Sequence, residues 1–205
     1  MRGTVVTALV MALAATSPSA AFAEQRQGVA DIGSASFTKA GSTVEVPTQG
    51  HCSITGPTSA NAPAVSKPGV TFGGGTSSCT TTETSTKSTA TGKNFELSAL
   101  VSAGGPRVKL ASFTVTCEGT RTQTSANWSY GGMSGITNPP NPVPVGYVSP
   151  LRKADGTVLA NAVFNIQSLP GDGSIGLTML RIDFLPASGI SGAVSLGRTS
   201  CTPTP

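Results

Sequence analysis

The sequence predicts a mainly β protein: an antiparallel β-sandwich stabilised by disulfides, with a long Ser/Thr/Gly-rich loop region. Three observations support this prediction. Turn formers are abundant, with 25 Gly and 15 Pro. Charged residues make up only 11% of the chain, and apolar residues rarely recur at helical spacing. Several short segments alternate apolar and polar residues between turn signals, which is typical of strands in a sandwich.

Residues 1–23 have the pattern of a secretory signal peptide. A short basic start with Arg2 precedes an apolar stretch, and the segment ends in Ala21-Phe22-Ala23, which suits signal peptidase. We therefore expect the mature chain to begin at Glu24, with an uncut membrane anchor as the alternative. No later segment resembles a membrane span, so the sequence predicts a secreted, extracellular protein with no transmembrane segment after cleavage.

The four cysteines, Cys52, Cys79, Cys117 and Cys201, all follow the predicted signal. An even number of cysteines in a secreted chain predicts disulfides, and four cysteines allow three pairings. We favour Cys52 with Cys79 and Cys117 with Cys201, because each pair then lies within one compositionally distinct region. Structural zinc needs closely spaced cysteine pairs, which are lacking here. We expect no metal and no other cofactor.

The mature chain divides by composition into two regions, 24–94 and 95–205, which we expect to form one domain. The first begins with alternating runs on either side of Lys39-Ala40-Gly41, which predict a hairpin. Its remainder, 53–92, is rich in Ser, Thr and Gly and carries little apolar surface. That segment is interpreted either as a long exposed loop or as edge strands whose hydroxyls face water.

The second region, 95–205, is predicted to form the core of the sandwich. Residues 157–167 also fit a helix, and we choose a strand because the neighbouring segments are strands. A phase change near Ala111-Ser112 predicts a β-bulge. In chain order, the expected strands are 95–103, 107–119, 157–167, 174–185 and 192–201.

Charge and histidine content exclude several function classes. The net charge is +4, but the basic residues do not gather with aromatic residues, so we expect no nucleic-acid partner. A Ser-His-Asp hydrolase would have to use His51, the one histidine, and no Gly-x-Ser-x-Gly motif accompanies it. His51 is therefore interpreted as a surface or loop residue.

Two carboxylates across a sugar bond would suffice for a glycoside hydrolase. The candidate acids are Asp155, Asp172, Asp183 and Glu118. However, Asp155 and Asp172 each precede a glycine, a pair that hairpin turns use. We assign no catalytic residue, and the balance is against an enzyme.

The segment around Trp128 is the strongest binding candidate. Trp128 and Tyr130 are two residues apart and share one face of a strand, where flat rings could stack on a sugar or anchor a protein partner. Tyr147 is a third candidate. The alternative is that Trp128 is a core residue of the sandwich, and we favour this alternative.

Residues 107–201 carry a series of short motifs in a distinctive order. They are "FTVTCEGT", "ANWSYGGMSGI", "PPNPVPV", "DGTVLANAVFN", "DGSIGLTMLRIDFL" and a closing "VSLGRTSC". This order resembles the secreted actinobacterial proteins of the choice-of-anchor P family. The resemblance implies a β-rich secreted or surface domain of unassigned function, in which Cys117 pairs with Cys201. Members are named for C-terminal anchors, and this chain shows none.

From these observations we expect a secreted, non-enzymatic protein at or outside the cell envelope. The alternative is an extracellular glycan-binding module or glycoside hydrolase that uses Trp128, Tyr130 and Tyr147. A cell-wall glycan or another envelope protein would be the partner.

Overall fold

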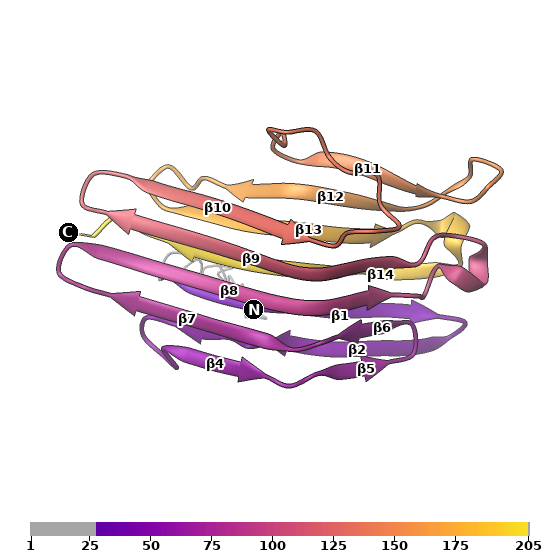
Figure 1. Ribbon diagram of the computed structural model, residues 1–205, viewed down its shortest axis with the longest axis horizontal. Coiled ribbons are helices and arrows are strands. Elements are labelled where there is room, and N and C mark those ends of the chain that lie inside the picture. The colour runs from indigo at the N-terminus through magenta and orange to yellow at the C-terminus, as the bar shows by residue number, and fades with distance from the viewer. Residues whose placement is uncertain (1–27, 205) are drawn as a thin grey trace, which may run out of the picture.

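The computed structural model describes residues 28–204, and the predicted signal peptide lies outside these residues. Two seven-stranded sheets, with antiparallel pairing throughout, lie face to face, as the predicted sandwich requires (Figure 1). Helical structure in the described chain is limited to two short 3-10 turns, η1 (Val101–Ala103) and η2 (Pro186–Ser188). No helix within residues 28–204 is long and apolar enough to cross a membrane.

The first sheet combines the two ends of the described chain. Its order is β11-β12-β13-β14-β1-β2, and β3 also pairs with β1. Its strands are β1 (Val29–Lys39), β2 (Ser42–Gln49), β3 (Cys52–Ser53), β11 (Tyr147–Arg152), β12 (Val158–Ser168), β13 (Ile175–Phe184) and β14 (Ile190–Cys201).

The second sheet is formed by the middle of the chain. The long strand β8 pairs with β9 along one side and with β6 and β7 along the other. At the edges, β10 pairs with β9, β5 with β6, and β4 with β7. Its strands are β4 (Ser59–Ala62), β5 (Val65–Lys67), β6 (Val70–Phe72), β7 (Gly75–Thr81), β8 (Ser85–Leu97), β9 (Val108–Thr120) and β10 (Thr124–Gly131).

The Ser/Thr/Gly-rich region forms strands, so the loop interpretation of 53–92 is wrong. β8 lies inside the sheet and crosses the compositional boundary at residue 94, which joins both regions in one sheet. Along β8, Ser88 and Ala90 are buried, whereas Lys87 is exposed and Thr89 is partly exposed. Small residues thus face inward and larger polar residues face water, a period-two pattern without large apolar side chains.

The core lies between the sheets and contains large side chains from both. Phe37 and Phe164 of the first sheet and Phe95 of the second are almost fully buried. Gly92 makes room for another ring, because a Cβ on this glycine would lie 2.3 Å from Cζ of Phe113 on the neighbouring strand. A side chain at position 92 would therefore displace Phe113 from the core.

Both disulfides join one sheet to the other. Cys52 in β3 is bonded to Cys79 in β7, and Cys117 in β9 is bonded to Cys201 in β14. The pairing favoured from the sequence is confirmed. No cysteine is left free among residues 28–204, which contain every cysteine of the chain.

Three further local predictions have clear outcomes. The hairpin at Lys39-Ala40-Gly41 is confirmed, since β1 and β2 meet there and both Ala40 and Gly41 have positive φ. The strand at 157–167 is confirmed as β12. The bulge near Ala111-Ser112 is wrong, because the β8–β9 register does not shift there. The irregularity lies across the pair instead, where Asn94 has a φ of 48°.

Candidate functional site

A groove lies where the two sheets meet the connection between β10 and β11. It is lined by residues 126–130 of β10, by the Pro-rich segment 139–143 and by Asn165 and Gln167 of β12. The groove is open to solvent and has a volume of about 500 Å³. It therefore combines an edge strand of the second sheet, a loop and a strand of the first sheet.

Aromatic rings form a continuous row beside this groove. The ring centroids of Trp128 and Tyr130 are 5.7 Å apart and the rings are stacked. Trp128 also stacks on Phe164 of β12, at a centroid distance of 6.1 Å. Tyr147 packs on the same phenylalanine, at 6.4 Å. Pairs of aromatic rings at such distances stabilise each other beyond their buried area.

The position of β10 explains why these rings are partly exposed. Trp128 and Tyr130 face the first sheet, whereas the alternating residues Asn127 and Ser129 face solvent. Because β10 is an edge strand, its inward side chains are only partly covered. The sequence favoured Trp128 as a central core residue, and this prediction is wrong. Trp128 packs against the core, is partly exposed and also lines the groove. Tyr147 contacts Phe164 but does not line the groove.

Two amide side chains of β12, Asn165 and Gln167, form the wall of the groove opposite β10. The sequence prediction did not select them. Asn165 is buried, and its Nδ2 donates to the carbonyl oxygen of Val143 in the Pro-rich segment at 2.9 Å. Gln167 Nε2 donates in turn to Asn165 Oδ1, also at 2.9 Å. Asn165 has a φ of 55°, a conformation that asparagine tolerates better than most residues. This backbone conformation is not visible from the period-two pattern, which places Asn165 simply on a polar face.

The candidate acids in turns have structural roles. Asp155 Oδ1 accepts a hydrogen bond from the backbone N–H of Thr157 at 2.9 Å, and this bond lowers the pKa of the Asp155 carboxyl below its ordinary value. Asp172 Oδ1 accepts one from the backbone N–H of Ser174 at 3.0 Å. Both are the turn contacts that an Asp-Gly sequence predicts.

The candidate acids in strands belong to surface ion pairs. Arg181 Nε donates to Asp183 at 3.0 Å, and Lys87 Nζ lies 3.7 Å from Glu118. Among the described residues, those that line the groove include no carboxylate. The lining of the groove thus offers aromatic rings and uncharged polar groups, and it lacks the acid pair of a glycosidase.

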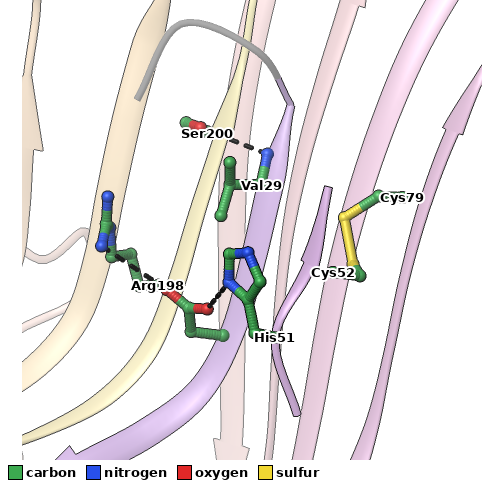
Figure 2. A network of polar contacts seen from close by, with 7 residues as sticks. Val29, His51, Cys52, Cys79, Arg198 and Ser200 are labelled. Atoms are coloured by element: carbon green, nitrogen blue, oxygen red, sulfur yellow. Dashed lines mark hydrogen bonds and ion pairs between the residues drawn. A yellow bond between two sulfur atoms is a disulfide. The ribbon is translucent and has the colours of Figure 1, made fainter. Parts of the chain in front are cut away.

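His51 has an acidic partner that the sequence prediction missed. Its Nδ1 lies 2.6 Å from Oδ1 of Asp31, which is only 5% exposed, and Arg198 Nη1 lies 3.5 Å from the other carboxylate oxygen (Figure 2). Val29, two residues before this acid, donates its N–H to the Ser200 hydroxyl. The network fastens β1 to β14 and to the segment before β3, beside the Cys52–Cys79 disulfide. The one sequence signal for this partner was the position of an acidic residue, Asp31, between the apolar residues Ala30 and Ile32.

We expect Asp31→Asn to lower the free energy of unfolding by about 1 to 3 kcal/mol, because the buried carboxylate that both His51 and Arg198 contact is removed. Urea denaturation measures the change. Asp183→Asn is the matched control, since its ion pair with Arg181 is solvent-exposed and contributes about 0.5 kcal/mol or less. Equal effects of the two substitutions would show that burial of Asp31 does not strengthen its contacts.

No group of three or more His, Cys, Asp or Glu residues in the part of the chain that the structure describes is arranged to hold a metal ion. The resemblance to the choice-of-anchor P family stays a prediction. Comparison of the chain with protein-family models, curated proteins and solved structures finds no match.

Proposed function

We propose that the protein is a non-enzymatic, extracellular glycan-binding module and that the groove beside Trp128 takes neutral sugar residues. The observation that carries this proposal is the combination in one groove of stacked, partly exposed Trp128 and Tyr130 with amide side chains and without carboxylates. The proposal keeps the expectation of a non-enzymatic protein. From the alternative, a glycan-binding module or a glycoside hydrolase, it adopts glycan binding.

The chemistry of the groove suits a sugar. The C–H faces of a pyranose pack on flat aromatic rings, while its hydroxyls need both donors and acceptors, which amide side chains supply together. Asn165 and Gln167 are held in place by their hydrogen bonds, so little side-chain entropy is lost on binding. The groove is open to solvent, which favours a segment of a longer chain over an enclosed small molecule.

The disulfides support a site of action outside the cell. Both bonds link the two sheets, and such structural disulfides persist in oxidising compartments. The predicted signal peptide and the resemblance to secreted actinobacterial proteins indicate the same place. An extracellular module of this kind would meet the glycans of its own envelope or of the surroundings.

Trp128 is the one tryptophan of the chain, so its fluorescence reports on the groove directly. Titration with neutral oligosaccharides should change the emission in a saturable way. Tyr130→Ala should weaken the affinity about tenfold or more, because one of the two stacking rings is lost. Tyr147→Ala is the matched control, since this tyrosine contacts Phe164 but does not line the groove.

Both variants keep Trp128, so the same titration measures all three proteins, and thermal melts check that each is folded. An emission that no oligosaccharide of the panel changes would overturn the proposal. Equal weakening by the two tyrosine substitutions would also overturn it, because the effect would then come from the aromatic row as a whole and not from the groove.

A further inference from the structure

The outer face of the second sheet carries a regular array of small polar side chains. One row crosses β4, β7, β8, β9 and β10 through Asn61, Thr76, Thr91, Thr114 and Ser129. The next row crosses the same strands through Ser59, Ser78, Thr89, Thr116 and Asn127. Every position in both rows is Ser, Thr or Asn, and all of these side chains are exposed or partly exposed. We call these two rows the hydroxyl array.

The sheet fixes the spacing of the hydroxyl array. Neighbouring positions within a row are separated by the distance between strands, about 4.8 Å, and the two rows by two residues along a strand, about 6.7 Å. Neither row contains a charge. The next position along the strands adds the ion pair between Lys87 and Glu118, whose charges compensate each other. The hydroxyl array is therefore a neutral surface with two constant repeats.

The outer face of the first sheet is different. There Arg181 and Asp183 project from β13, and Glu45 projects from β2. Exposed β faces usually carry such charges, which oppose non-specific association. The outer face of the second sheet also carries charges beside the rows, with Lys87 and Glu118 at one side and Lys93 at the other, but the rows themselves contain none.

The hydroxyl array is continuous with the groove. Its two rows end on β10 at Ser129 and Asn127, and both of these residues also line the groove. A ligand that extends from the groove across β10 therefore comes directly onto the array.

We propose that the hydroxyl array and the groove form one binding surface for a neutral, insoluble polysaccharide in which chains lie side by side. The groove takes one chain and the array contacts the chains next to it. This inference rests on the proposed function for the class of ligand, and it adds the physical form in which that ligand is recognised.

The lack of charge in the rows favours a neutral polysaccharide over an anionic one, since an anionic polymer would be drawn to a basic surface. A single hydrogen bond between hydroxyls contributes little, because both partners lose water. A rigid sheet presents many of them at once, directly or through water, and loses almost no conformational entropy. A regular surface therefore gains from the array, whereas a short soluble oligosaccharide occupies the groove alone.

The test compares insoluble and soluble forms of the same glycan. The insoluble probes are microcrystalline cellulose, chitin and an insoluble β-1,3-glucan, and the soluble probes are the corresponding hexasaccharides. Thr91→Lys/Thr116→Lys places two long charged side chains in the middle of the array, one in each row. Ser36→Lys/Ser191→Lys, on the outer face of the first sheet, adds the same charge as a matched control.

We expect the array variant to lose at least tenfold in partition onto the insoluble glycan that the wild type binds, with its hexasaccharide affinity unchanged within twofold. The control should keep both. Thr76→Lys, at an exposed position of the array, is the second variant if the double substitution does not fold. It should lose at least threefold in partition.

Unchanged partition of the folded array variant would overturn the inference, as would a wild type that binds none of the three solids. Loss of the soluble affinity together with the insoluble one would overturn it too, because the groove would then have been disturbed. If no hexasaccharide binds the wild type but the array substitutions still abolish partition, the proposed role of the groove fails and the array stands.

Discussion

Removal of the Cys117–Cys201 disulfide will lower the free energy of unfolding by about 2 to 5 kcal/mol. The bond connects β9 of the second sheet to the last residue of β14 in the first, across a sequence separation of 84 residues. Without it, the unfolded chain gains the conformational freedom that the closed loop had removed. We specify Cys117→Ala/Cys201→Ala, because both positions are fully buried and serine would bury an additional hydroxyl.

The other disulfide provides the comparison. Cys52→Ala/Cys79→Ala opens a loop with a separation of 27 residues, for which the chain-entropy model expects a loss smaller by about 1 kcal/mol. Urea denaturation of the two double variants and the wild type gives the three free energies. A larger loss for the shorter loop would show that packing around the sulfurs, and not chain entropy, sets the contribution of each bond.

The disulfide pairing was predictable, but the reason for it was not. The sequence argument placed each pair within one compositional region, as if Cys52–Cys79 restrained a loop. In the structure both bonds cross from one sheet to the other. At the β3–β7 end the buried side chains around Cys52–Cys79 are Ala30 and Ala90, so the disulfide fills space that large apolar residues fill elsewhere.

The same end of the molecule explains why the Ser/Thr/Gly-rich segment was ambiguous. A strand with small inward residues buries little apolar area, and from sequence alone this is the composition of a loop. Strand pairing depends on partners far along the chain, such as Thr89 of β8 with Thr116 of β9. The hydroxyls that suggested a loop are the ones that form the outer face of the second sheet.

Of the groove residues, Trp128 and Tyr130 were predictable, whereas Asn165 and Gln167 were not. Trp128 and Tyr130 could be selected because aromatic residues two apart on a strand share a face whatever the rest of the fold is. Asn165 depends on a positive φ and on the path of the Pro-rich segment, which no local pattern specifies. Asp31 and His51 come together because β1 and the segment before β3 are neighbours, a tertiary relationship without a sequence motif.

Phe164→Ala is the second substitution with a large expected effect. The ring is 1% exposed and packs against both Trp128 and Tyr147, so its removal leaves a cavity between the sheets. Truncation of a buried phenylalanine costs about 3 to 5 kcal/mol, a large part of the stability of a domain of this size. Thermal and urea unfolding measure the loss.

Phe164→Leu separates the stability of the core from the shape of the groove. Leucine retains most of the buried apolar volume, so we expect a folded protein destabilised by about 1 to 2 kcal/mol. Trp128 nevertheless loses one of the two flat rings on which it stacks, and its orientation is then less restrained. Affinity for a neutral oligosaccharide should fall at least about fivefold, near 1 kcal/mol. The measurement is fluorescence titration.

Phe37→Leu is the matched control for that loss. Phe37 is buried to a similar degree, but its ring packs on Phe184 at a centroid distance of 5.2 Å, whereas the ring of Phe164 stacks on Trp128 of the groove. It should cost similar stability and leave the affinity unchanged. If both leucine variants bind as the wild type does, the orientation of Trp128 does not depend on Phe164. Only Phe164→Leu removes a ring that stacks on Trp128. If both leucine variants bind more weakly, the affinity therefore depends on global stability and not on the stacking of Trp128.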